Sequence, residues 1–154
     1  MTAPITVLLV DDHALVRRGF RRLLEDDPAL AVVGEASTGE EAVARVAELR
    51  PHVVVMDSAM PGMGGIAATS AIRAAAPDVR VLMLSMHSED TLVRQALAAG
   101  ASGYVLKSAL DLDLAAAVKQ VHAALAIDFG LSRTWNLERR AACRKQGYGV
   151  PCWG

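Results

Sequence analysis

Cysteine is scarce in this 154-residue chain, since only Cys143 and Cys152 occur and both lie near the C-terminus. A single pair without a further cluster of cysteine or histidine ligands favours neither a disulfide framework nor a zinc site. Long apolar runs are also missing, because no stretch reaches the ~18 residues that a membrane span needs. The N-terminus lacks the basic start of a signal peptide. These absences predict a cytoplasmic protein that does not contact a membrane.

A dominant charge of one sign is missing as well. Lys and Arg total 16, Asp and Glu total 17, and the formal net charge is −1. A nearly neutral chain gives no general argument for nucleic-acid binding. Apolar residues make up 53% of the sequence and charged residues 21%, which is typical of a globular protein. The length matches one typical domain and is sufficient for a core.

Short apolar runs alternate with amphipathic segments along the first 125 residues. The runs predict strands at 5–10, 31–36, 53–57, 79–84 and 102–106. The segments predict helices from about 14 to Pro28, from Thr38 to Pro51, and over 66–76, 88–99 and 110–125. This alternation predicts a parallel sheet with helices on both faces and right-handed crossovers.

Local signals place the faces and ends of several helices. The first helix is predicted to bury one apolar stripe made of Val16, Phe20, Leu23 and Leu24. Ser37 or Thr38 is expected to begin the second helix, because two acids follow in its first turn. Ser88 is the predicted N-cap of the fourth helix, and Gly100 is expected to follow its end.

The stretch from Val53 to Gly65, VVVMDSAMPGMGG, is the centre of the predicted sheet. Four apolar residues run into Asp57, and Pro61 with three nearby glycines then excludes further strand. The carboxylate of Asp57 is therefore predicted to stand at the carboxyl end of a buried strand. In open α/β sheets, ligands bind at that edge.

Polar residues follow three other predicted strands at the same edge. Asp11 and Asp12 follow the first strand, Ser85 the fourth and Lys107 the fifth. Carboxylates gathered in one crevice repel each other, and a divalent cation with oxygen ligands such as Mg²⁺ relieves that repulsion. A lysine and a serine hydroxyl can hold phosphoryl oxygens, and a carboxylate can attack phosphorus to form an aspartyl phosphate.

Each of these residues also has an ordinary structural interpretation. Asp11 or Asp12 could simply be the N-cap of the first helix, and Ser85 and Lys107 could be a strand-end hydroxyl and a solvated lysine. The two loop histidines, His13 and His87, have no partner at metal-ligand spacing in the sequence. The functional hypothesis therefore depends on the joint placement of acids, hydroxyl and lysine.

Four motifs carry a family resemblance: VLLVDDH, VVVMDSAMPGMGG, VLMLSMH and GASGYVLKS. They resemble the bacterial response-regulator receiver domain, and the wording LSMH and GASGYVLK is similar to NarL/FixJ-type (LuxR-like) transcription regulators. The resemblance covers residues 5 to about 125. It implies a (βα)₅ flavodoxin-like fold, a doubly wound five-stranded parallel sheet of order 2-1-3-4-5.

The resemblance also implies a function and a site. A sensor histidine kinase would pass a phosphoryl group to Asp57 in a Mg²⁺-dependent reaction. The residues implied as ligands of Mg²⁺ are Asp11, Asp12, Asp57 and the backbone carbonyl of Ala59. Ser85 and Lys107 would hold the phosphoryl oxygens, and Ser85 with Tyr104 would switch the face of the fourth helix, fifth strand and fifth helix for dimerisation or output. Tyr104 could instead be ordinary core filler.

The periodic pattern ends near Ala126, so residues 1–125 are predicted to be the receiver domain and 126–154 a short atypical tail. The tail holds both Trp and both Cys, and one short helix is predicted over 136–146. NarL/FixJ-type proteins usually continue into a DNA-binding helix-turn-helix domain, which this tail does not resemble. Either the chain is a stand-alone receiver, or its output domain is truncated or altered.

Two other functional classes stay open at the level of sequence. The chain could be a DNA-binding transcription regulator itself, although the missing helix-turn-helix argues against DNA contact by this chain. A hydrolase or flavin protein is a further alternative, because fold does not determine function. A phosphatase of the dehalogenase type requires a second acid at position 59, where this chain has Ala59. A flavodoxin requires a phosphate-binding loop rich in Ser, Thr and Gly after the first strand, and the sequence there, DDHALVRRG, is not such a loop. The preferred interpretation is a phosphoacceptor and not an enzyme.

Overall fold

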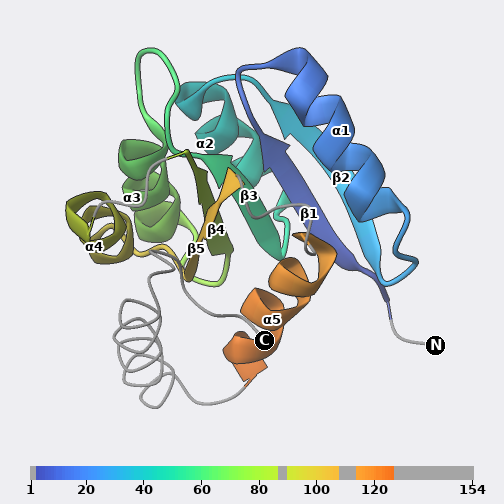
Figure 1. The fold of residues 1–154 in the computed structure, drawn as a ribbon. Helices are drawn as coiled ribbons and strands as arrows, with labels where there is room; N and C mark the ends of the chain where they lie inside the picture. Colours follow the sequence, from blue (N-terminus) through green and yellow to red (C-terminus); the bar gives the residue numbers. More distant parts are fainter. Residues whose placement is uncertain (1–2, 87–89, 108–113, 127–154) are drawn as a thin grey trace.

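The protein folds into alternating strands and helices, seen in a computed structural model that describes residues 3–86, 90–107 and 114–126 (Figure 1). The strands are β1 (Ile5–Val10), β2 (Leu30–Ala36), β3 (Val53–Asp57), β4 (Arg80–Ser85) and β5 (Gly103–Leu106). The helices are α1 (Ala14–Glu25), α2 (Gly39–Leu49), α3 (Gly65–Ala75), α4 (Asp90–Ala98) and α5 (Leu114–Ala126). Each of the strands and helices predicted over the first 125 residues is present in the described part of the chain, with ends that differ by a few residues from the predicted ones.

The strands form one parallel sheet of order β2-β1-β3-β4-β5. This order confirms the predicted doubly wound sheet 2-1-3-4-5. Strand β3 is central, and its last residue, Asp57, pairs with Leu84. Ser85, the last residue of β4, pairs with Leu106 directly before Lys107. The register therefore brings three of the predicted site residues to adjacent strand ends.

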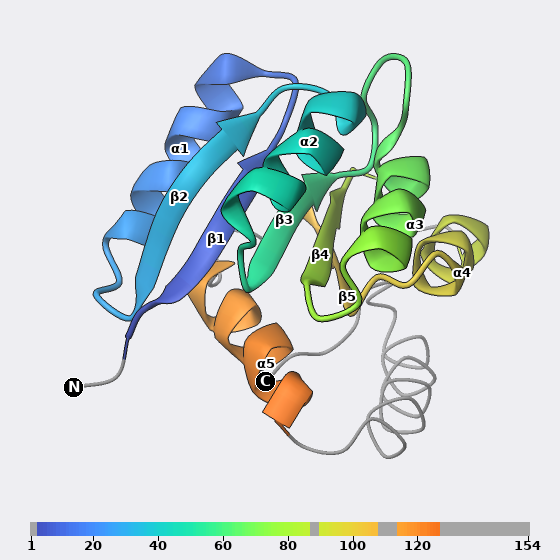
Figure 2. The same ribbon diagram turned by 180° about the vertical axis from the view of Figure 1, so that it is seen from behind.

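Two helical layers cover the sheet. Figures 1 and 2 show α1 and α5 on one face and α2, α3 and α4 on the other. Successive residues of β3 serve the two faces: Val53 and Val55 pack in the α1/α5 core, and Val54 and Met56 pack in the other core. A strand buried on both faces needs an unbroken apolar run, which explains the sequence VVVM.

The apolar stripe predicted for α1 is only partly buried. Leu24 is fully buried and Phe20 packs against the α1/α5 core, but Leu23 is 47% exposed and Val16 37% exposed. Arg17 and Arg21 lie beside this stripe and pair with Glu35 on β2, as described below. The contact of α1 with β2 is therefore partly polar. A narrower apolar stripe, with Leu24 and Phe20, is sufficient to pack α1 against the sheet. The prediction was wrong for Val16 and Leu23.

Most local signals for helix ends agree with the structure. Thr38 is the N-cap of α2, and its hydroxyl accepts a hydrogen bond from the Glu41 N–H at 3.0 Å. Gly100 follows α4 with a φ of +108°, a conformation that favours glycine. The predicted N-cap Ser88 and the predicted helix over 136–146 lie outside the described residues. Leu114, Val118 and Val121 of α5 are buried against the sheet core.

Within the part of the chain that the structure describes, no helix combines the length and apolarity required to cross a bilayer.

Candidate phosphoacceptor site

Asp57 lies at the end of the central strand and is only 3% exposed. Its Oδ1 accepts a hydrogen bond from the backbone N–H of Ala59 at 3.2 Å, which holds the carboxylate against the following loop. That loop returns so closely that a Cβ on Gly65 would lie 2.2 Å from the Asp57 carbonyl oxygen. A glycine is therefore required where α3 begins. Gly64, which precedes it, is the N-cap.

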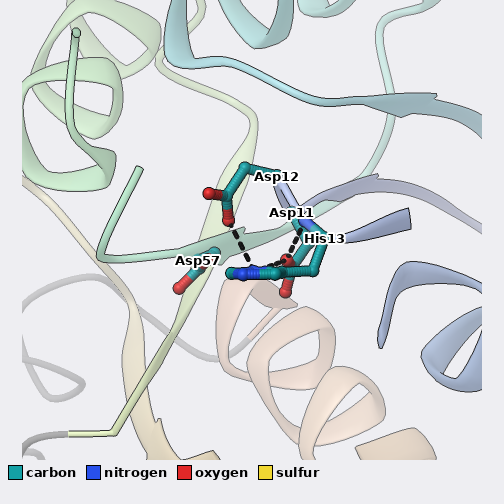
Figure 3. Close-up of side chains that lie close together, drawn as sticks. All are labelled: Asp11, Asp12, His13 and Asp57. Carbon is teal, nitrogen blue, oxygen red and sulfur yellow. Dashed lines mark hydrogen bonds and ion pairs between the residues drawn. The ribbon is translucent and has the colours of Figure 1, made fainter. Parts of the chain in front are cut away.

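The two acids after β1 turn toward Asp57. Asp11 is 1% exposed, and its Oδ1 accepts a hydrogen bond from the His13 N–H at 2.8 Å. The N-cap of α1 is His13, so neither Asp11 nor Asp12 has the capping position that was the structural alternative. One ligand atom from each of Asp11, Asp12, His13 and Asp57 lies within 4.8 Å of the others. Figure 3 shows these four side chains gathered at the strand ends.

Lys107 connects acids from two strands. Its Nζ lies 3.2 Å from Asp57 Oδ1 and 3.2 Å from Asp11 Oδ2, and the side chain is 15% exposed. Lys107 follows β5, two strands away from β3, so only the folded sheet brings these groups together. One ammonium group shared between two buried carboxylates leaves the cluster with excess negative charge.

The pKa values of Asp57 and Lys107 reflect this crowding. Burial raises the pKa of Asp57, and the charge of Asp11 raises it further, while Lys107 and the Ala59 N–H oppose the increase. Burial alone would lower the pKa of Lys107, but the charges of Asp57 and Asp11 outweigh burial and raise it. The lysine therefore stays charged at neutral pH, and the ionised form of Asp57 is held at a cost in free energy.

An arginine on α1 holds the loop that carries the acids. Arg17 Nη1 donates to the carbonyl oxygen of Asp11 at 2.6 Å, and its Nε donates to Glu35 Oε1 at 2.7 Å. Arg21 pairs with the other oxygen of Glu35. Burial of Glu35 would raise its pKa, but the two arginines outweigh burial and lower it. Glu35 thus orients Arg17, and Arg17 fixes the backbone of Asp11.

The remaining predicted residues are Ser85, Tyr104 and Ala59. Ser85 is fully buried at the end of β4, beside the end of β3. Tyr104 is fully buried in the core beneath α2, α3 and α4. Ala59 lies two residues after Asp57 and contributes its N–H to that carboxylate. The predicted contact of Ser85 with a phosphoryl group, the switch role of Ser85 and Tyr104, and the metal contact of the Ala59 carbonyl stay predictions.

The sequence interpretation missed His13. It was treated as a loop histidine without a metal-ligand partner, yet its Nδ1 lies 3.0 Å from Asp12 Oδ1 and 3.6 Å from Asp11 Oδ1. The signal was present in the run Asp11-Asp12-His13, because a helix that begins directly afterwards leaves all three side chains at its N-terminal end.

The donor set fits a divalent cation. Three carboxylates supply oxygen atoms, the ligands that Mg²⁺ prefers. Asp12 Oδ1 is buried and accepts no hydrogen bond from the described part of the chain. Its contact with His13 Nδ1 at 3.0 Å has the distance of an ion pair. A buried carboxylate oxygen without a hydrogen bond is costly, and a bound cation would relieve that cost.

Comparison with known proteins places this site in a family. The sequence profile of the response regulator receiver domain matches residues 7–119, which include the whole site. The chain belongs to the response regulator receiver family. The receiver domain is 47% identical over 118 residues to the response regulator UvrY of Escherichia coli (strain K12), covering 77% of this chain and 54% of UvrY. It is 43% identical over 119 residues to the response regulator GacA of Pseudomonas aeruginosa, covering 77% of this chain and 56% of GacA.

Solved receiver structures share the fold. The signal receiver domain of the response regulator NarL from Mycobacterium tuberculosis superposes with a TM-score of 0.76 at 35% identity, covering 79% of this chain and 98% of that one. A LuxR-family two-component response regulator from Aurantimonas sp. SI85-9A1 has a TM-score of 0.73 at 44% identity, covering 80% and 86%. The chain spans about half the length of the curated relatives it matches.

Proposed function

We propose that this receiver domain accepts a phosphoryl group on Asp57 from a sensor histidine kinase, with Mg²⁺ as the cofactor. One observation carries the proposal: a buried carboxylate at the end of the central strand lies 3.2 Å from Lys107 Nζ and beside two further acids. A structural aspartate needs only one partner. A carboxylate surrounded by like charges and one lysine is arranged instead for an anionic ligand and a cation.

The chemistry would use the two oxygens of Asp57 differently. Oδ1 is held by the Ala59 N–H and Lys107, so Oδ2 is the oxygen positioned to attack. A bond forms between Oδ2 and phosphorus while the bond from phosphorus to the donor nitrogen breaks. The electron pair of that bond returns to the imidazole of the kinase, which then takes up a proton. The product is an aspartyl phosphate.

The other residues would hold the transferring group. Asp11, Asp12 and Asp57 would hold Mg²⁺ together with the carbonyl of Ala59, and the ion would supply positive charge that offsets the negative charge of the carboxylates and of the transferring group. Lys107 would add positive charge from the end of β5, and the hydroxyl of Ser85 would donate a hydrogen bond to a phosphoryl oxygen. The protein would catalyse only the transfer of the phosphoryl group to Asp57 and its later hydrolysis, and it would act on no other substrate.

Phosphorylation at Asp57 would be transmitted to the surface formed by α4, β5 and α5. Ser85 would move toward the phosphoryl group, and Tyr104 would follow it, which changes the surface of α4, β5 and α5. New anionic charge at Asp57 supplies the differential interaction that such a shift needs. Dimerisation of this surface, or its binding to an output partner, is the expected response.

Phosphorylation is tested by incubating the chain with Mg²⁺ and acetyl phosphate and recording its intact mass. We expect a gain of one phosphoryl group in the wild type, none in Asp57→Asn, and none in the wild type with excess chelator. Asp78→Asn is a matched control on an acid elsewhere on the fold and should gain the group normally. An equal gain in Asp57→Asn would overturn the proposal.

Transcription regulation is the second candidate. Its support is the family of relatives, since a structure of two RcsB dimers bound to DNA resembles this chain with a TM-score of 0.71 at 28% identity, covering 78% of this chain and 61% of that one. The similarity concerns the receiver region. A salt-dependent mobility shift of duplex DNA by the 154-residue chain would support direct DNA contact, and its absence would restrict the chain to signalling through a partner.

A further inference from the structure

His13 places an imidazole ring at the mouth of the acid site. The residue is the N-cap of α1, and its backbone N–H is bound to Asp11 Oδ1 at 2.8 Å. The ring itself makes no capping hydrogen bond and is 69% exposed. Its position is therefore set by the backbone, while its Nδ1 points to the acids as Figure 3 shows. Capping and core packing do not account for this ring.

The ring nitrogen faces an oxygen that lacks a hydrogen bond. Nδ1 lies 3.0 Å from Asp12 Oδ1, the buried oxygen that accepts no hydrogen bond from the described residues. An octahedral ion with bonds of about 2.0–2.1 Å holds neighbouring ligand atoms about 3.0 Å apart. The spacing of this nitrogen and this oxygen, which is that of an ion pair, is also compatible with two adjacent ligands of one cation.

A nitrogen donor changes which ions the site favours. Oxygen donors suit Mg²⁺ and Mn²⁺, whereas imidazole suits Ni²⁺, Cu²⁺ and Zn²⁺, and the affinity of a given site rises from Mn²⁺ to Cu²⁺ and then falls at Zn²⁺. Asp11, Asp12 and Asp57 alone would form an oxygen site. With His13 beside them, the set becomes three carboxylates and one nitrogen.

We propose that His13 is a specificity-determining ligand of the cation site, binding late first-row ions through Nδ1 together with the carboxylates of Asp12 and Asp57. The inference rests on the proposed metal site and adds to it a preference among ions. Mg²⁺ would be held by the oxygen atoms without the ring. Ni²⁺ would use the same oxygen atoms with the ring, so the two ions compete for one site.

The test measures metal binding directly. Ni²⁺ and Mg²⁺ are titrated separately by calorimetry into the full chain, in a Cys143→Ser, Cys152→Ser background that removes thiol ligands. We expect His13→Ala to weaken Ni²⁺ binding by about tenfold or more, since even outer partners of metal ligands contribute that much. Mg²⁺ affinity should change by less than about twofold, because Mg²⁺ keeps oxygen ligands and waters.

Controls separate this site from other histidines and from misfolding. His122, whose ring lies 5.1 Å from that of His52, provides the matched variant His122→Ala, which should leave both affinities unchanged. Asp12→Asn should weaken the binding of both Ni²⁺ and Mg²⁺. Because the His13 ring is exposed, His13→Ala should keep the thermal unfolding temperature of the wild type. In the wild type, Ni²⁺ should broaden the ring proton signals of His13, and added Mg²⁺ should reduce the broadening.

Each result has one meaning. Failure of Mg²⁺ to bind the wild type would overturn the proposed metal site and the inference together. Binding of Mg²⁺ with Ni²⁺ affinity unchanged in His13→Ala would overturn the inference alone. An equal loss for both ions would assign His13 a structural role, and Ni²⁺ that Mg²⁺ cannot displace would place it at another site. The last two results also overturn the inference.

Discussion

At the scale of single residues, Asp57 combines low exposure with unfavourable electrostatics. The pKa of its carboxyl is raised first by burial and then by the charge of Asp11. A group whose folded pKa is raised destabilises the fold when ionised. That cost is present at neutral pH and disappears as the pH falls through the raised pKa to the ordinary value of 3.8. The proposed phosphoacceptor thus reduces the stability of its own domain.

We predict that Asp57→Asn raises the unfolding temperature in metal-free buffer at pH 7. The gain should shrink as the pH falls through the raised pKa and disappear below 3.8, where the wild-type carboxyl is protonated in both states. Thermal unfolding followed by circular dichroism at several pH values measures this difference.

Asp27→Asn provides the matched control, because Lys119 and the Ala29 N–H lower the pKa of Asp27. A carboxyl whose folded pKa is lowered stabilises the fold when the pH is above its ordinary pKa, which is 3.8 for Asp27. Asp27→Asn should therefore be less stable than the wild type at pH 7. An Asp57→Asn protein less stable than the wild type would contradict the assigned electrostatics.

At the scale of elements, the apolar residues predicted to form one buried stripe on helix α1 differ in how deeply they are buried. Leu23 and Leu24 are neighbours in the sequence, yet Leu24 is fully buried and Leu23 is 47% exposed. Periodicity identified the helix and its general inner face. It could not decide that Arg17 and Arg21 would pair with Glu35 on β2, because that pairing joins residues of separate elements.

Alanine substitution of these two leucines should separate their contributions. Leu24→Ala leaves a cavity in the α1/α5 core and should reduce the free energy of unfolding by about 2–5 kcal/mol. Leu23→Ala removes a half-exposed side chain and should change it by less than about 1 kcal/mol. Urea denaturation at fixed pH compares both with the wild type, and equal losses would contradict the burial described for α1.

At the scale of the whole molecule, the site joins strands that are far apart in the chain. The acids after β1, the acid that ends β3 and the lysine after β5 meet only in the folded sheet. An ion bound there binds the folded state and not the unfolded chain. Binding energy at the site is therefore stability for the entire domain.

We predict that Mg²⁺ stabilises the wild type against heat. At a concentration one hundred times the dissociation constant, the expected gain is about 2.7 kcal/mol, or about 5–10 °C for a domain of this size. Differential scanning calorimetry with increasing Mg²⁺ measures the shift. Asp12→Asn should show a much smaller shift, and an equal shift in both proteins would place the ion elsewhere.

The sequence alone determined the order of strands and helices, because apolar runs, helical periodicity and the Pro and Gly breaks are local properties of the chain. It also placed Asp57 at a strand end, because the apolar run ends at Asp57 and the Pro and Gly residues from Pro61 onward exclude further strand. Only the tertiary structure decided that Lys107 reaches two acids and that His13 faces Asp12. Those contacts depend on strand register and loop return, which arise from packing across the whole sheet.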